Sequence, residues 1–158
     1  EGTLVAWEVP ETGFQVTQSY RKQDKKQVET VLSGKVIHPA YYQDTDQVDS
    51  RKQATACPPN VIHSFDGANL VMAVNHARQN GVTHIGVVHD SFATHAGDMT
   101  QLGMSIRQSF VELHSNPLIA DLEAQFLAAA EDPEDIPEPP TKGDLDLGKV
   151  IASNYFFA

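Results

Sequence analysis

Asp90 is the residue of this chain whose surroundings best suit it to chemistry. It lies in the polar break His89–Ser91, after the β-branched run Val82–Val88 and before the next apolar residue, Phe92. This pattern predicts a strand, a tight turn and a second strand. A carboxylate in such a turn is firmly held, and it is a hard oxygen ligand for Mg²⁺. A turn aspartate without chemistry is the alternative, because short motifs often match by chance.

Two other constellations could also do chemistry. His84, His89 and His95 could join Asp90 in a zinc or iron site of a metal-dependent hydrolase. A strand that contains both His84 and His89 would point them to opposite faces, which disfavours that site. Cys57 and His63 could form a thiol nucleophile with its base, but prolines follow the cysteine and no oxyanion motif is present.

Composition limits the class of protein. The chain has 158 residues, enough for one domain, and a formal net charge of −10. That charge disfavours a free-standing nucleic-acid binder with a basic face and a protein that binds anionic membranes. The single cysteine excludes an internal disulfide and fits a reducing compartment. Because the chain begins with Glu1 and not Met, we expect a processed product, an excised piece or the later part of a longer protein.

The first half of the chain predicts mostly strands and loops. Leu4–Val9 and Phe14–Tyr20 flank a Pro10–Gly13 turn, which indicates a hairpin. Arg21–Lys26 is the only basic cluster, and we expect a solvated loop there, with a nucleic-acid backbone contact as the alternative. Further along, we expect a strand at Thr30–Pro39 and a loop at Tyr41–Asp49.

Two helices are predicted before the Asp90 hairpin. A short helix at Val48–Ala56 should end at the Pro58, Pro59 pair. Asn60 or Ser64 should cap the next helix, which has one apolar face and ends at Gly81. That face comprises Leu70, Val71, Val74 and Ala77.

After the hairpin, periodicity predicts helices at Asp98–His114 and Leu118–Ala130, packed against each other. Residues 131–140 hold four prolines and five acids, which predicts a solvated linker. We also expect Asp121 and Glu123 to be solvated. A short helix at Asp144–Ala152 should follow, and the apolar end Tyr155–Ala158 should dock against the protein.

Four segments, in their order and spacing, are similar to one known family. They are Asp49–Gln53, Pro59–Asp66, His89–Ser91 and Phe156–Ala158. Together they resemble the C-terminal region of the single-subunit RNA polymerases of bacteriophages and mitochondria, and the likeness covers most of the chain. The chain departs from that family at Asn69, where His is common, and at Ala56, where Gly is usual.

The resemblance implies a role for Asp90 as one of two palm carboxylates that bind two Mg²⁺ ions for nucleotidyl transfer. His63 and Ser64 resemble positions that contact the template and the RNA near its growing end, and His89 would lie beside the metals. Ser91 stands where related DNA polymerases carry Glu, which favours an RNA polymerase. Phe157 and Ala158 resemble a C-terminal foot near the active site.

The fold implied by the resemblance is an α/β (α+β) palm with an antiparallel or mixed sheet and flanking helices. The palm segment would span residues 1–130, the linker 131–142 and the foot 143–158. The second metal-binding Asp, and the Lys and Tyr that bind the incoming nucleotide, would lie upstream of Glu1. We therefore expect this chain to be inactive alone.

The implied partners are a DNA template, nascent RNA, ribonucleoside triphosphates and the remaining N-terminal, fingers and thumb parts of the polymerase. The cytoplasm of a phage-infected host is the expected location, with mitochondria or another organelle as the alternative. A non-catalytic domain that binds nucleic acid or a partner remains a second hypothesis, and the metal-dependent hydrolase a third.

Overall fold

The computed structural model describes residues 3–156, an α+β chain whose strands form four two-stranded sheets. This confirms the expected fold class. The described part contains no helix that is both long and apolar enough to span a membrane. Two compact units are present. The first comprises the chain up to Ala6 with Thr17–Asn60, and the second comprises Trp7–Val16 with the chain from Val61 onward.

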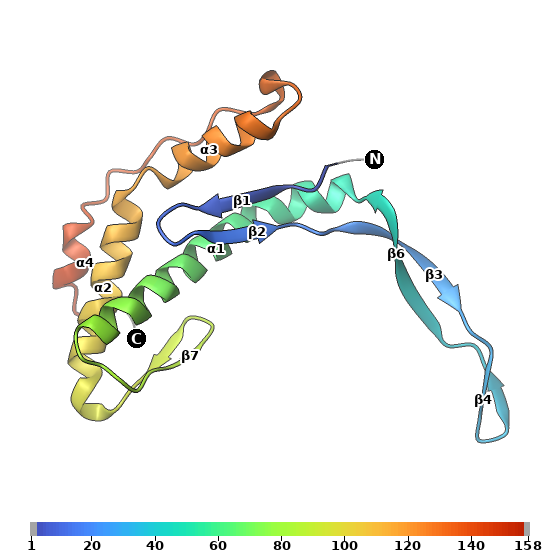
Figure 1. Ribbon diagram of the computed structural model, residues 1–158, viewed down its shortest axis with the longest axis horizontal. Coiled ribbons are helices and arrows are strands. Elements are labelled where there is room, and N and C mark those ends of the chain that lie inside the picture. The colour runs from blue at the N-terminus through green and yellow to red at the C-terminus, as the bar shows by residue number, and fades with distance from the viewer. Residues whose placement is uncertain (1–2, 157–158) are drawn as a thin grey trace. The chain divides into compact units, whose positions relative to one another are not determined.

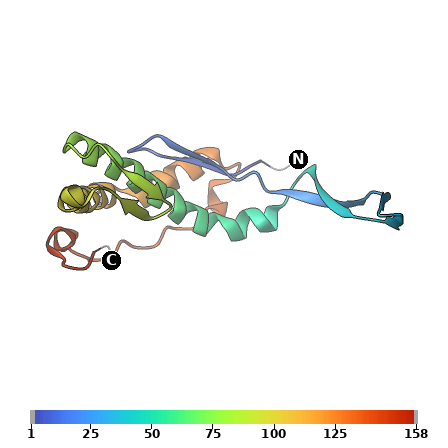
Figure 2. The same cartoon turned by 90° about the horizontal axis from the view of Figure 1, so that it is seen from below.

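The expected N-terminal hairpin is confirmed as β1 (Ala6–Val9) paired with β2 (Phe14–Thr17). A longer ribbon follows, in which β3 (Arg21–Gln27) pairs antiparallel with β6 (Ala40–Val48). At its tip, β4 (Thr30–Leu32) pairs antiparallel with β5 (Lys35–Ile37) (Figures 1 and 2).

The loops predicted at Arg21–Lys26 and Tyr41–Asp49 are therefore wrong, as is the single strand predicted at Thr30–Pro39. Almost every side chain of the β3–β6 ribbon is exposed. Because neither face of the ribbon is buried, its sequence does not show the alternation of apolar and polar residues by which a strand is usually recognised. Cross-strand contacts link the strands instead. The Gln23 side-chain amide donates to Asp44 at 2.8 Å, and the Thr45 hydroxyl donates to the Lys22 carbonyl at 2.9 Å.

A single helix, α1 (Ser50–Gln79), continues through Pro58 and Pro59, so the predicted break there is wrong. Asp49 caps it by accepting a hydrogen bond from the Lys52 amide at 3.0 Å. Side-chain amides hold the helix on both sides of the prolines. Gln53 Nε2 donates to the Gln18 carbonyl at 2.7 Å, and Asn60 Nδ2 donates to Gln18 Oε1 at 2.7 Å. Asn60 is thus part of this network and not a cap.

The end of α1 at Gly81 is confirmed, and its geometry is that of a Schellman motif. The Gly81 amide donates to the Arg78 carbonyl at 3.1 Å and the Val82 amide to the Ala77 carbonyl at 2.9 Å. Gly81 has a φ of +90°, a left-handed conformation that favours glycine. The predicted apolar face is partly wrong, because Val71 is exposed whereas Met72 and Ala73 are buried.

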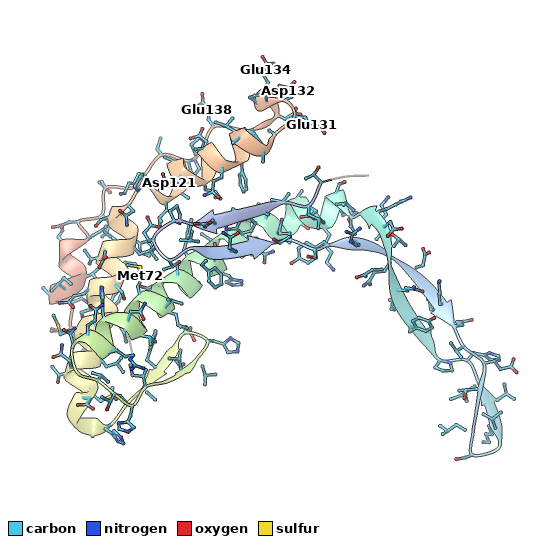
Figure 3. The ribbon with its side chains drawn as sticks, in the orientation of Figure 1. Met72, Asp121, Glu131, Asp132, Glu134 and Glu138 are labelled. Atoms are coloured by element: carbon cyan, nitrogen blue, oxygen red, sulfur yellow. The ribbon has the colours of Figure 1, made fainter. Side chains whose placement is uncertain are left out.

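The remaining helices largely follow the sequence pattern. They are α2 (Met99–Ser115), α3 (Leu118–Ala129) and α4 (Gly148–Ala152), with short 3₁₀ turns at Ala96–Asp98 and Pro133–Asp135. Helix α3 contacts β1. Trp7 and Phe126 meet edge to face at 6.2 Å, and Gln125 Nε2 donates to the Glu8 carbonyl at 2.9 Å. Figure 3 shows the labelled acids along and after α3, and those from Glu131 to Glu138 are exposed as predicted.

The docking predicted for the C-terminal end is confirmed for Phe156 but is wrong for Tyr155, whose side chain is 90% exposed. The centre of the Phe156 ring lies 5.0 Å from that of Phe110. The Arg107 guanidinium carbon lies 5.8 Å from the centre of the same Phe156 ring. Arg107 Nη2 also donates to the Ser153 carbonyl at 2.8 Å, so α2 holds the tail at two points. Phe157 and Ala158 lie outside the described residues. The boundaries 1–130, 131–142 and 143–158 stay a prediction.

We expect Gly81→Ala to destabilise the protein by about 1–2 kcal/mol, because a Cβ is strained in the left-handed region. Urea unfolding would measure this. Gly97→Ala is the matched control, since its φ is not positive and a Cβ there would have open space. If the two substitutions changed the free energy of unfolding equally, the left-handed conformation of Gly81 would have no special effect on stability.

Candidate functional site

The predicted hairpin around Asp90 is present. Strand β7 (Gly86–Val88) pairs antiparallel with β8 (Ser91–Ala93), and Val88 lies opposite Ser91. His89 and Asp90 therefore form the two-residue turn, and both are exposed. His89 has a φ of +53°, the sign that two-residue hairpin turns require and that His adopts more readily than most residues. The turn thus presents an imidazole and a carboxylate side by side in sequence.

A hollow of about 710 Å³ lies between this hairpin and α1. Its lining comes from five helix residues and three hairpin residues: His63, Asp66, Gly67, Asn69, Leu70, His89, Asp90 and Phe92. Three of the predicted site residues, His63, His89 and Asp90, are thus brought together from segments more than twenty positions apart. In Figure 1 the hairpin lies alongside the C-terminal half of α1.

Ser64 is not among the residues of the hollow. It is 2% exposed, its Oγ accepts a hydrogen bond from Trp7 Nε1 at 3.0 Å and it donates to the Val61 carbonyl at 2.7 Å. The structure thus places this predicted contact residue in the packing between α1 and β1. Ser91, in β8, does not line the hollow either.

Asp66 and Asn69 line the hollow, although the sequence pattern gave them no site role. Helical spacing is the signal that could have found Asp66. Residues three and four positions after His63 share its side of a helix, which places Asp66 and Gly67 beside it. Gly67 also permits close packing at this point, because a Cβ there would lie 3.3 Å from the Phe14 ring.

The hairpin is held in place by apolar contacts. Phe92 and Ile85 are partly buried against a cluster formed by Ala73, Ala77, Val82, Leu102 and Ile106. Phe156, from the docked tail, packs against the same cluster. The ring of Phe92 thus forms part of the hollow and also packs on the core.

The donors of the hollow suit a hard cation in part. Asp90 and Asp66 supply carboxylates, the ligand type that Mg²⁺ prefers. Residues 3–156, however, contain no group of three or more His, Cys, Asp or Glu side chains able to hold a metal ion. This part of the chain therefore offers ligands for a shared site and does not enclose an ion by itself.

The geometry gives little support to the histidine metal site or to the Cys57 and His63 pair considered from the sequence. The His84 and His95 rings meet edge to face at 4.8 Å, but His89 does not line the smaller hollow beside them. Burial raises the pKa of the Cys57 thiol, which disfavours the thiolate that a nucleophile requires.

Comparisons with known proteins agree with one another. Residues 1–134 match the family described as DNA-dependent RNA polymerase. Over 157 residues the chain is 41% identical to DNA-directed RNA polymerase 2, chloroplastic/mitochondrial, of Arabidopsis thaliana, covering 99% of this chain and 15% of that relative. It is 38% identical over 157 residues to the mitochondrial DNA-directed RNA polymerase 1 of the same plant, covering 99% of this chain and again 15% of the relative.

One relative has nearly the same length. DNA-directed RNA polymerase 1A of Nicotiana tabacum is 37% identical over 157 residues, which cover 99% of this chain and 97% of that relative. The chain thus spans 15% of the length of the two Arabidopsis relatives and almost all of the tobacco one.

The neighbouring residues His63 and Ser64 should respond differently to substitution. We expect Ser64→Ala to lower the free energy of unfolding by about 1–3 kcal/mol, because it leaves Trp7 Nε1 buried without its acceptor. His63→Ala should change it by less than about 0.5 kcal/mol, because the side chain is exposed. Urea unfolding of both variants would measure this, and a larger loss for His63→Ala would mean that the histidine is a packing residue.

Proposed function

The chain belongs to the DNA-dependent RNA polymerase family, and from this we propose that it supplies the C-terminal part of a polymerase catalytic centre. The reaction would be template-directed addition of ribonucleoside monophosphates to an RNA 3′ end. The hollow is the observation that supports this most, because it joins His63 to the His89–Asp90 turn. These are the side chains for which the resemblance implies contacts to the growing RNA end and to the metals.

Asp90 would be one of two carboxylates at a two-Mg²⁺ site. Its place in a two-residue turn that packs on the core through Phe92 limits how far the carboxylate can move. Bound there, the ions would lower the pKa of the RNA 3′ hydroxyl and neutralise the pyrophosphate leaving group. The second carboxylate, and the Lys and Tyr for the incoming nucleotide, would come from the rest of the polymerase.

His63 and His89 would orient the RNA end beside Asp90. Both side chains are exposed and line the hollow, so each can reach a bound nucleotide. Phe157 and Ala158 would support the site from the tail. Phe156, the residue before them, already packs on the same cluster as Phe92, which favours such a position for the foot.

The partners we propose are a DNA template, nascent RNA, ribonucleoside triphosphates and the remaining parts of the polymerase. The location we propose is an organelle, because the relatives from Arabidopsis have names that specify chloroplasts or mitochondria. The first expectation, the cytoplasm of a phage-infected cell, has no support among these relatives.

We expect Asp90→Asn to reduce nucleotide addition by a factor on the order of 10³, which corresponds to about 4 kcal/mol of transition-state stabilisation. Loss of a charged oxygen ligand is the reason, and template binding should be largely retained. The measurement is Mg²⁺-dependent extension of a primed template by this chain together with the rest of the polymerase.

The chain alone, the mixture and the Asp90→Asn mixture form the three arms of this experiment. Asp144→Asn is the matched control, because it removes one exposed charge outside the hollow. A complex that forms but never extends the primer would favour the non-catalytic binding domain. Full activity of Asp90→Asn would remove Asp90 from the mechanism.

The basic strand β3 would contact the nucleic-acid backbone. Replacing Lys25 and Lys26 by Gln should weaken template binding and lower its salt slope by roughly 1–2, about 0.9 for each phosphate that a lysine no longer neutralises. Both side chains are exposed on the ribbon. Binding titrations at several salt concentrations would measure this, with Lys142→Gln/Lys149→Gln as the charge-matched control. An equal change in both pairs would indicate an effect of net charge alone.

A further inference from the structure

Two histidines lie opposite each other at the open end of the β7–β8 hairpin. Gly86 pairs with Ala93, so the same register continued by two residues pairs His84 with His95. The Thr94 hydroxyl donates to the His84 carbonyl at 2.6 Å, and the backbone of His95 is extended, with a φ of −63° and a ψ of 147°. The chain thus keeps strand geometry up to the histidine pair.

The histidine pair lies on the solvent face of the hairpin. Side chains two positions apart in a strand share a face, so His84 lies on the same face as Gly86 and Val88, which are exposed. Phe92 lies on the opposite face, against the apolar cluster. Both histidines are exposed and border a hollow of about 580 Å³, distinct from the larger hollow that Asp90 lines.

The ring nitrogens that would bind a metal ion are available. His84 Nδ1 lies 2.9 Å from Thr83 Oγ1, within hydrogen-bond distance. Among residues 3–156, neither His84 Nε2 nor either ring nitrogen of His95 has a hydrogen-bond partner. A metal-binding histidine commonly donates from one ring nitrogen to an oxygen while the other nitrogen binds the ion. The Thr83 hydroxyl fits the first of these contacts and leaves Nε2 of His84 for the second.

The distance between the two rings fits one shared ion. Their centres are 4.8 Å apart and their planes are inclined by 67°. An imidazole nitrogen binds Zn²⁺ at roughly 2.0–2.1 Å, so two imidazoles at an angle of about 90–110° would have centres roughly 4.5–5.2 Å apart. The observed separation lies within this range. Imidazole suits Zn²⁺, Cu²⁺ and Ni²⁺, whereas Mg²⁺ prefers oxygen ligands.

We propose that His84 and His95 together bind one divalent transition-metal ion such as Zn²⁺. Within the described part of the chain, no further His, Cys, Asp or Glu joins them in a group able to hold a metal, so water would complete the coordination. This site differs from the one with Asp90 that the sequence suggested, because His89 lies in the turn at the other end of the hairpin. It does not depend on the proposed function.

A bound ion would stabilise the hairpin that carries Asp90. Each strand has only three residues, and a hairpin of that size is marginally stable without further support. An ion held by both histidines would link the strands at the end opposite the turn, and a metal link of this kind lowers the entropy of the open hairpin.

The experiment titrates the full chain with Zn²⁺ by calorimetry, with Mg²⁺ as the control ion. We expect one Zn²⁺ to bind, and His84→Ala or His95→Ala should weaken its binding on the order of 10²-fold, because the linkage of two ligands is lost. Thr83→Val should weaken it roughly 10-fold by removing the orienting hydroxyl. His38→Ala, an exposed histidine between β5 and β6, is the matched control and should leave the affinity unchanged.

Amide hydrogen exchange supplies a second readout. Zn²⁺ should slow exchange across residues 86–93 in the wild type and not in His84→Ala or His95→Ala, because only an ion that joins the strands opposes their separation. Both histidines are exposed, so without zinc these two variants should unfold at the same urea concentration as the wild type.

The outcomes separate this inference from the proposed function. Absence of zinc binding by the wild type, or equal binding by both histidine variants, would overturn the site and leave primer extension as the test of the polymerase. Binding that His63→Ala abolishes and His84→Ala does not would assign the ion to the larger hollow and also overturn it. Binding that needs both histidines but leaves exchange unchanged would overturn only the stabilisation of the hairpin.

Discussion

The position of Asp90 depends on apolar packing beneath a very short hairpin. Strands β7 and β8 have three residues each, and an isolated two-stranded hairpin of that size is at best marginally stable in water. Phe92 and Ile85 attach it to the cluster of Ala73, Ala77, Val82, Leu102 and Ile106. The hydrogen bonds of the hairpin set its register, but the cluster fixes it beside α1, and only then does the turn form one wall of the hollow.

The same cluster couples the end of α1 to the beginning of the hairpin. Of the two Schellman hydrogen bonds, the one that spans more residues runs from Val82 to Ala77, and both residues are buried in the cluster. Such contacts commonly accompany this motif and fix the direction in which the chain leaves the helix. Three residues later the chain reaches Ile85 and the first strand. Since Phe156 packs on the cluster as well, residues distant in the sequence share one support for the turn.

Sequence patterns predicted the elements that bury one face and expose the other. The Asp90 hairpin, the end of α1 at Gly81 and the amphipathic α2 all place apolar residues at the spacing of their element. The β3–β6 ribbon was missed because it is exposed on both faces and no hydrophobic period records it. The continuity of α1 across Pro58 and Pro59 was not predicted. Hydrogen bonds from Gln18 to Gln53 and Asn60, residues more than thirty positions away, hold the helix there, and local helix propensity does not reflect such contacts.

The two buried polar residues of α1 near the hollow differ in a way that only the structure reveals. Ser64 and Asn69 are both buried, and either could be a satisfied core residue by sequence alone. Ser64 has its partners within the fold, in Trp7 and the Val61 carbonyl. Asn69 Oδ1 has none among the described residues, although an apolar side chain at this site would avoid the penalty. Ser64 therefore contributes to packing between α1 and β1, whereas Asn69 lines the hollow together with His63, His89 and Asp90.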